Sequence, residues 1–165
     1  MAYIWSVIPL SRYLTVFFSA GGTTARAARA VAGAVDADLF EIRPAVSYTA
    51  ADLNWNNPAS RTSVEMNDEA CRPELASAEV PDLTEYDAVF VGFPIWWYVE
   101  PRIVDSFLDR CSLEGVKLIP FATSGGSGIS QAESRLRALY PQADWRGGRL
   151  IKRGGEAAWA AEAVK

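Results

Sequence analysis

Histidine is absent from the 165 residues of this sequence, and its absence removes several kinds of chemistry. Without an imidazole, the chain can build neither a Ser-His-Asp triad nor a Cys-His pair, and it has no histidine ligand for a metal. Proton transfer would therefore fall to aspartate, glutamate, tyrosine, lysine or a bound cofactor. We expect no catalytic side chain of the usual kind and no metal site.

Cysteine is also scarce, because the sequence contains only Cys71 and Cys111. The two do not form a C-x-x-C motif, which disfavours a zinc site and thioredoxin-type redox chemistry. Isolated cysteines of this kind are typically buried free thiols. Free thiols favour a reducing compartment, and we expect the protein to be cytoplasmic.

The sequence also lacks an excess of basic charge and long apolar runs. The net charge of −4 disfavours the broad basic surface that nucleic-acid binding needs. No apolar run approaches the roughly 20 residues of a membrane span. The apolar start MAYIWSVIPLS lacks the basic residues and the cleavage site of a signal peptide. We interpret residues 1–11 as an N-terminal extension or an added remnant, followed by one domain over residues 12–165.

The sequence does contain a regular alternation of strand and helix patterns. Half of the residues are apolar and 22% are charged, which is typical of a globular domain with one core. Apolar periodicity and residue type predict strands at 13–18, 38–42, 87–93, 116–122 and 149–151, and helices at 23–35, 69–78, 101–110, 130–139 and 156–164. Helices between successive strands predict an α/β three-layer sandwich around a doubly wound, five-stranded parallel sheet.

Residues 45–80 depart from this alternation. They are polar, rich in asparagine and serine, and contain a single tryptophan, Trp55. A long irregular stretch in a compact domain usually indicates a functional loop or lid.

The loop after the first strand, Ser19-Ala20-Gly21-Gly22-Thr23-Thr24, has the composition of a phosphate site. A helix N-terminus attracts phosphate through its free N–H groups and its dipole, and glycines allow close approach. The loop lacks the lysine of G-x-x-x-x-G-K-[ST] and the spacing of G-x-G-x-x-G, so a monophosphate fits better than a nucleoside triphosphate or a dinucleotide. An ordinary turn capped by threonine remains the alternative.

Two further loops follow the third and fourth predicted strands. Gly92-Phe93-Pro94-Ile95-Trp96-Trp97-Tyr98 is aromatic and is interpreted as a platform for a flat ring, or else as core or an interface anchor. Thr123-Ser124-Gly125-Gly126-Ser127-Gly128 could present backbone amides to ring oxygens, or be a plain turn. Ligands of doubly wound sheets bind beyond the carboxyl ends of the strands. Together, the three loops predict one site for a phosphorylated planar ring.

Three stretches, VFFSAGGTTARAA, YDAVFVGFPIWWYVEPRIVDSFL and KLIPFATSGGSG, resemble the flavodoxin family, in particular its compact bacterial members. The resemblance covers nearly all of residues 12–165. It implies strand order 2-1-3-4-5, with FMN at the point where the order reverses, as flavodoxin itself illustrates.

The resemblance also implies a role for each loop residue. The FMN phosphate would be bound by Ser19, Gly22, Thr23 and Thr24; the isoalloxazine ring would be flanked by Pro94, Ile95, Trp96, Trp97 and Tyr98; and its pyrimidine side would meet Thr123, Ser124, Gly125, Gly126 and Gly128.

Gly21 lies within the phosphate loop and departs from the family pattern, because members commonly have threonine there. A hydrogen bond to a charged group contributes roughly 1.5–3 kcal/mol. Its loss would weaken FMN binding about tenfold or more.

The function implied by the resemblance is electron transfer by bound FMN, with redox partner proteins or a small electron acceptor. Two alternatives stay open: an FMN-dependent NAD(P)H oxidoreductase with a quinone-type acceptor, and an interaction module without flavin. The exposed tryptophans that the sequence predicts are compatible with a monomer or a dimer.

Overall fold

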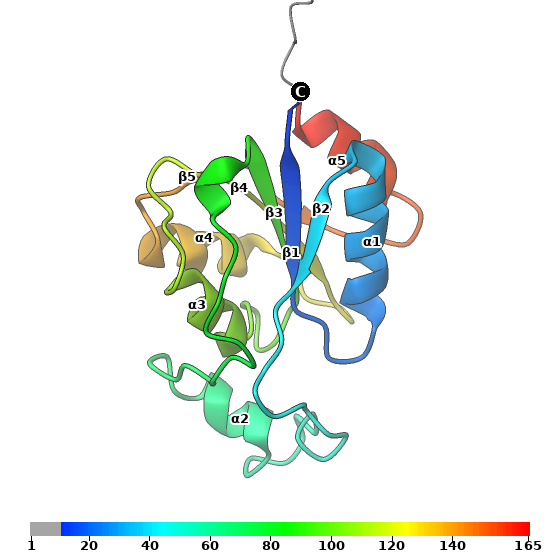
Figure 1. Ribbon diagram of the computed structural model, residues 1–165. Helices are drawn as coiled ribbons and strands as arrows, with labels where there is room; N and C mark the ends of the chain where they lie inside the picture. Colours follow the sequence, from blue (N-terminus) through cyan, green and yellow to red (C-terminus); the bar gives the residue numbers. More distant parts are fainter. Residues whose placement is uncertain (1–10) are drawn as a thin grey trace, which may run out of the picture.

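The computed structural model describes residues 11–165, and Figure 1 shows a parallel sheet with helices on both sides. The strands are β1 (Tyr13–Phe17), β2 (Asp38–Glu41), β3 (Ala88–Pro94), β4 (Lys117–Thr123), β5 (Asp144–Trp145) and β6 (Arg149–Leu150). Their order is β2-β1-β3-β4-β5, with β6 also paired to β4, and every pairing is parallel. The predicted α/β fold and its strand order 2-1-3-4-5 are confirmed.

Helices cover the two faces of the sheet. The α-helices are α1 (Thr23–Val35), α2 (Arg61–Met66), α3 (Arg102–Leu108), α4 (Ser130–Leu139) and α5 (Glu156–Ala163), with a 3-10 turn, η1, at Leu83–Glu85; α2 lies beyond the end of the sheet. α1 and α5 pack on one face, and α3 and α4 pack on the other (Figure 1). None of the helices in residues 11–165 is long and apolar enough to cross a membrane.

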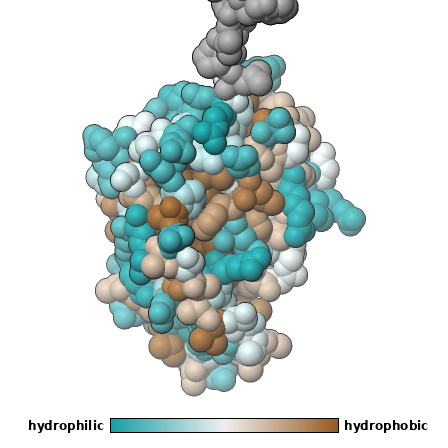
Figure 2. Space-filling model, in the orientation of Figure 1, coloured by the Kyte–Doolittle hydropathy of each residue, from teal (hydrophilic) through white to brown (hydrophobic). Residues whose placement is uncertain are grey.

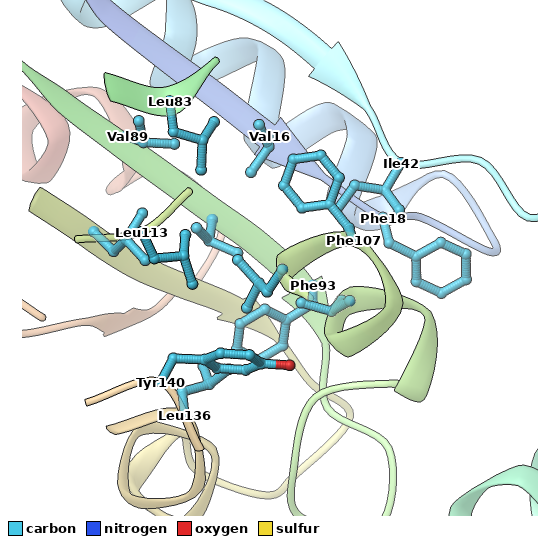
Figure 3. Close-up of a cluster of buried hydrophobic side chains, with 14 of the residues drawn as sticks. Val16, Phe18, Ile42, Leu83, Val89, Phe93, Phe107, Leu113, Leu136 and Tyr140 are labelled. Carbon is cyan, nitrogen blue, oxygen red and sulfur yellow. The ribbon is translucent and has the colours of Figure 1, made fainter. Parts of the chain in front are cut away.

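The core follows from the two-residue period of a strand. In β3, Val89, Val91 and Phe93 face the cluster under α3 and α4, whereas Phe90 faces the cluster under α1 and α5. Figure 3 shows the first cluster, in which Phe107 of α3 lies among residues from the sheet. Burial on both faces makes the sheet a rigid frame for the loops at its carboxyl edge.

Gly92 of β3 is required by close packing within this frame. A Cβ atom at this position would lie 2.2 Å from Cζ of Phe121 on the neighbouring strand. The glycine therefore lets a large aromatic side chain fill the space just before the aromatic loop begins.

The predicted helix at 69–78 is wrong. That segment is irregular, and its Leu75 pairs with Pro44 in an isolated β-bridge. Pro73 interrupts helical hydrogen bonding and disfavours helical geometry in the residue before it. The helix of this region is α2, which begins earlier, where the Ser60 hydroxyl accepts a hydrogen bond from the Ser63 N–H at 3.3 Å.

Three smaller expectations have different outcomes. The strand expected at 149–151 is present as β6, and the short strand β5 before it was not predicted. Cys71 and Cys111 are free, but half-buried rather than fully buried. Except for Ser11, the expected N-terminal extension lies outside the described residues.

Candidate cofactor-binding site

A cleft of about 810 Å³ opens where β1, β3 and β4 end. All three predicted loops contribute to its wall, and a fourth contribution comes from the irregular segment 45–80. The lining residues are Ser19, Ala20, Gly21, Thr23, Thr24, Leu53, Trp55, Thr62, Pro94, Ile95, Trp96, Trp97, Tyr98, Thr123, Ser124, Gly125 and Ser127.

The first loop presents an uncapped helix end to the cleft. Gly22 is the N-cap of α1 and has φ 96°, a conformation that favours glycine, and no side chain caps the helix. The Gly22 N–H donates to the Ser19 hydroxyl at 3.1 Å, which closes the loop. The first N–H groups of α1 are thus available to an anion. Gly22 shapes the loop without itself lining the cleft.

A buried hydrogen bond joins the first and third loops. The hydroxyl oxygens of Thr24 and Thr123 lie 2.7 Å apart, and both residues are almost fully buried. Only one of two paired hydroxyls is the donor, so the other keeps its own O–H for a further acceptor. Thr24 therefore fixes the spacing of the two loops, a role that sequence reasoning did not anticipate.

The aromatic loop turns through two residues in the left-handed region. Trp97 has φ 47° and Tyr98 has φ 69°. The flanking Trp96 N–H donates to the Val99 carbonyl at 2.9 Å, and the Val99 N–H donates back at 3.1 Å. Turns of this kind usually carry Asn-Gly, and each non-glycine residue there costs about 1–3 kcal/mol. Trp97 and Tyr98 nevertheless line the cleft, with 38% and 60% of their surface exposed.

Trp96 differs from its two aromatic neighbours. Its ring meets Phe18 and Tyr48 edge-on, with centroids 5.4 Å apart in both pairs. It is packed against the main core cluster while one side still reaches the cleft. Trp96 is therefore an anchor of the loop, and the freely accessible ring faces belong to Trp97 and Tyr98.

The third loop lies beside the aromatic loop. The Ile95 N–H donates to the Thr123 carbonyl at 2.9 Å, and the Gly126 N–H donates to the Ser124 hydroxyl at 3.1 Å. Of the residues predicted here, Thr123, Ser124 and Gly125 line the cleft, whereas Gly126 and Gly128 do not. Ser127, which was not predicted, completes this part of the wall.

Residues 48–66, here called the arm, supply a further part of the wall. The sequence predicted a functional loop or lid in residues 45–80, but no individual site residue within it. The arm carries Leu53, Trp55 and Thr62 to the cleft. Trp55 is 71% exposed. The signals for this segment in the sequence were its length, its irregular polar composition and its lone tryptophan.

The arm is held by its own hydrogen bonds. The Thr49 N–H donates to the Asp52 carboxylate at 2.9 Å, and the Asp52 N–H donates to the Thr49 hydroxyl at 3.1 Å. The Thr62 hydroxyl donates to the Asp52 carbonyl at 2.7 Å, and the Ser63 hydroxyl donates to the Asn57 carbonyl at 2.8 Å. These bonds explain why serine, threonine and asparagine dominate a segment without long helices or strands.

Tyr48 attaches the arm to the aromatic loop. Its hydroxyl donates to the Glu65 carboxylate at 2.7 Å, and the Arg61 guanidinium lies 3.8 Å from the centre of its ring. Burial and the bond to Glu65 raise the pKa of Tyr48 well above its ordinary value, so it remains a donor. The Tyr48 ring also contacts Trp96, so the arm and the aromatic loop are held together beside the cleft.

Among residues 11–165, no charged side chain lines the cleft. Arg26, one turn into α1, is paired with Glu156 at 3.0 Å. The attraction for an anion thus depends on the α1 N-terminus and the hydroxyls around it. With these groups beside the first loop and aromatic rings on the second, the residues fit a phosphate attached to a flat, uncharged ring.

The chain is similar to a known protein family and to several solved structures. A family model described as flavodoxin matches residues 12–162. A crystal structure from Bacteroides uniformis ATCC 8492, assigned as a flavoprotein, is 49% identical, with a TM-score of 0.86; the alignment covers 92% of this chain and 96% of that one. One from Bacteroides eggerthii DSM 20697, assigned likewise, is 46% identical, with a TM-score of 0.88 and coverage of 94% and 99%.

A more distant similarity concerns a flavoprotein of Lactobacillus acidophilus NCFM crystallised in complex with FMN. It is 17% identical, with a TM-score of 0.71, and the alignment covers 94% of this chain and 99% of that one. At this identity the likeness shows the fold. No protein with a curated description matches the chain.

Proposed function

The chain belongs to the flavodoxin family, and on that premise we propose that it binds one FMN in the cleft and serves as an electron-transfer protein. The observation that carries the proposal is the arrangement of the cleft: an uncapped helix N-terminus on one loop, exposed aromatic rings on the next, and no charged side chain in the lining. When bound, FMN would supply the redox chemistry.

Each part of the cleft has a distinct task in this proposal. The α1 N-terminus, with Ser19 and Thr23, holds the phosphate. Trp97 and Tyr98 offer ring faces to the isoalloxazine, and the amides of the third loop meet its pyrimidine side. The hydrogen bond between Thr24 and Thr123 keeps the phosphate end and the ring end at a fixed spacing.

Trp55 adds a wall that the family resemblance did not suggest. It lies on the arm, comes from a different segment than Trp97, and lines the same cleft. We assign it to cover the ring site and restrict the access of water. The arm also shapes the space through which a small acceptor would approach, which is the observation that favours an oxidoreductase as the second candidate function.

The uncharged lining favours the carrier over an NAD(P)H oxidoreductase. The phosphates of a pyridine nucleotide need helix N-termini or basic side chains. The one helix end in this cleft is assigned to the FMN phosphate, and Arg26 and Arg61 are both paired with carboxylates. We therefore propose redox proteins as partners. The two free cysteines support a cytoplasmic location.

The test is a titration of the purified protein with FMN, followed by the visible spectrum and the flavin fluorescence. We expect saturable binding of one FMN and slow consumption of added NADPH by the complex. Fast NADPH oxidation with a quinone would favour the oxidoreductase. A protein that does not bind FMN at micromolar concentration would contradict both flavin functions and leave the interaction module.

A further inference from the structure

A buried cluster of charged residues lies behind the aromatic loop. Glu100 and Asp105 are both fully buried, and both accept hydrogen bonds from one guanidinium nitrogen of Arg135. The distance from this nitrogen to the Asp105 carboxylate is 2.7 Å. Two fully buried carboxyl groups therefore share one cationic partner, whose own side chain is 14% exposed.

One oxygen on each carboxyl group has no visible partner. Glu100 Oε2 and Asp105 Oδ1 are buried without a hydrogen bond to a group in the described part of the chain. The two carboxyl groups are held side by side, because their other oxygens bond the same nitrogen of Arg135. Two ionised carboxylates held side by side repel each other, whereas a carboxylic acid beside a carboxylate avoids this repulsion and can donate a hydrogen bond to it.

None of the surrounding groups in residues 11–165 donates a hydrogen bond to either orphaned oxygen. The Arg102 guanidinium donates to the backbone carbonyls of Asp68 and Met66, both at 3.1 Å, and its third nitrogen is also buried without a partner. The Tyr140 hydroxyl is directed to Asp109 at 2.8 Å and to the backbone carbonyl of Asp105 at 3.2 Å.

Glu69 is the remaining charged group that acts on Arg102, and it lies on the exposed side of this region. It therefore offers the two orphaned oxygens no partner.

The cluster connects the two loops that flank the ring site. Glu100 follows Val99, which closes the turn of the aromatic loop. Asp105 lies on α3, directly after that loop, and Arg135 lies on α4, directly after the third loop. A bond between Glu100 and Asp105 thus fixes the end of the aromatic turn, while Arg135 ties both residues to the third loop.

We propose that Glu100 is a positioning residue: as a carboxylic acid it shares one proton with Asp105 and so holds the aromatic loop and the third loop at the spacing that the cofactor needs. The shared proton is inferred from the cluster alone, and the positioning role rests on the proposed function. Loss of the proton leaves two buried anions facing one guanidinium, which moves Glu100 and the turn next to it.

Glu100 loses its proton at a pH that a solution experiment can reach. Burial, and then the charge of Asp105, raise the pKa of Glu100 from 4.5 to about 8. The folded chain keeps a proton that the unfolded chain releases, so the free energy of unfolding decreases as the pH rises from 4.5 to about 8. Because histidine is absent, no imidazole titrates in this window.

The first experiment uses the protein without FMN and follows the infrared band of a protonated carboxyl group with pH. In the wild type we expect a band near pH 6.5 that disappears around pH 8. In Asp105→Asn the band should disappear at lower pH, because the neighbouring negative charge is gone. Glu100→Gln should show no titrating band, and the exposed control Glu114→Gln should behave as the wild type.

The same infrared measurements can contradict the shared proton. A wild type without the band at pH 6.5, or a band that persists unchanged in Glu100→Gln, overturns the shared proton on Glu100. If Glu100→Gln does not fold, the wild-type titration and its shift in Asp105→Asn decide the question instead.

The second experiment measures the FMN dissociation constant between pH 7 and 9, above the pKa near 6 of the FMN phosphate. We expect the constant to rise with pH in the wild type and in Glu114→Gln, by up to about tenfold per pH unit, and to stay level in Glu100→Gln. A level constant in the wild type, while the infrared band titrates, overturns the positioning role alone.

A protein that binds FMN at no pH overturns the proposed function and the positioning role together, while the infrared result still decides the shared proton.

Discussion

At the scale of single residues, Gly21 is the position in the phosphate loop where the resemblance to flavodoxins predicted a threonine. A Cβ added there would have no atom within 4 Å, and the backbone is not in the left-handed region, so a larger residue fits without strain. We predict that Gly21→Thr lowers the FMN dissociation constant about tenfold, by adding a hydroxyl donor to the phosphate. Gly21→Val, which has the same shape without the hydroxyl, should match the wild type in a fluorescence titration. Equal affinities of the threonine and valine variants would contradict the missing-hydroxyl explanation.

Substitutions of the two adjacent tryptophans should affect different properties, FMN affinity for Trp97 and stability for Trp96. Trp97 is exposed to the cleft, so Trp97→Ala should weaken FMN binding by about 0.5–1.5 kcal/mol, the range of aromatic pairing, and change unfolding in urea by less than about 0.5 kcal/mol. Trp96 packs against Phe18 and Tyr48. Trp96→Ala should therefore destabilise the fold toward the roughly 3 kcal/mol of a buried aromatic truncation. Equal urea midpoints for the two variants would show that Trp96 is not the anchor.

At the scale of elements, the aromatic turn combines strain with exposure. Tyr98 has φ 69°, a conformation that glycine adopts without strain. We predict that Tyr98→Gly raises the free energy of unfolding by about 1 kcal/mol and weakens FMN binding. Tyr98→Ala removes the same ring but keeps the strain, so it should lose affinity without the gain in stability. Urea unfolding and FMN titration of both variants test this, and a stabilised alanine variant would contradict the role of strain.

The elements also show which parts of the structure the sequence could predict. The strands were predictable because Val89, Phe90 and Val91 are buried on both faces and form one apolar run. The arm was not, because its position depends on pairings distant in sequence, such as Tyr48 with Trp96, that leave no periodic pattern. The helix expected at 69–78 failed at Pro73, and α2 was overlooked because it is six residues long and is recognisable mainly by its Ser60 cap.

At the scale of the whole molecule, the cleft joins segments that the sheet brings to one edge. The three loops could be predicted because each follows a recognisable strand, and parallel strands end on the same side. The wall formed by Trp55 and the bond between Thr24 and Thr123 could not, since both require the tertiary arrangement. Occupation of the cleft therefore affects residues from Ser19 to Ser127 together, and its effect should appear in global unfolding.

The last prediction compares how much the phosphate and the ring of FMN each contribute to binding. A ligand that binds only the folded chain adds about 2.7 kcal/mol to the free energy of unfolding when its concentration is 100 times the dissociation constant. We predict that FMN raises the melting temperature accordingly. Riboflavin, which has the same ring without the phosphate, should raise it less at equal concentration, and inorganic phosphate should raise it little. In Gly21→Thr the gap between FMN and riboflavin should widen, because only FMN meets the added hydroxyl. Equal effects of FMN and riboflavin would place the binding energy in the ring alone and remove the α1 N-terminus from the site.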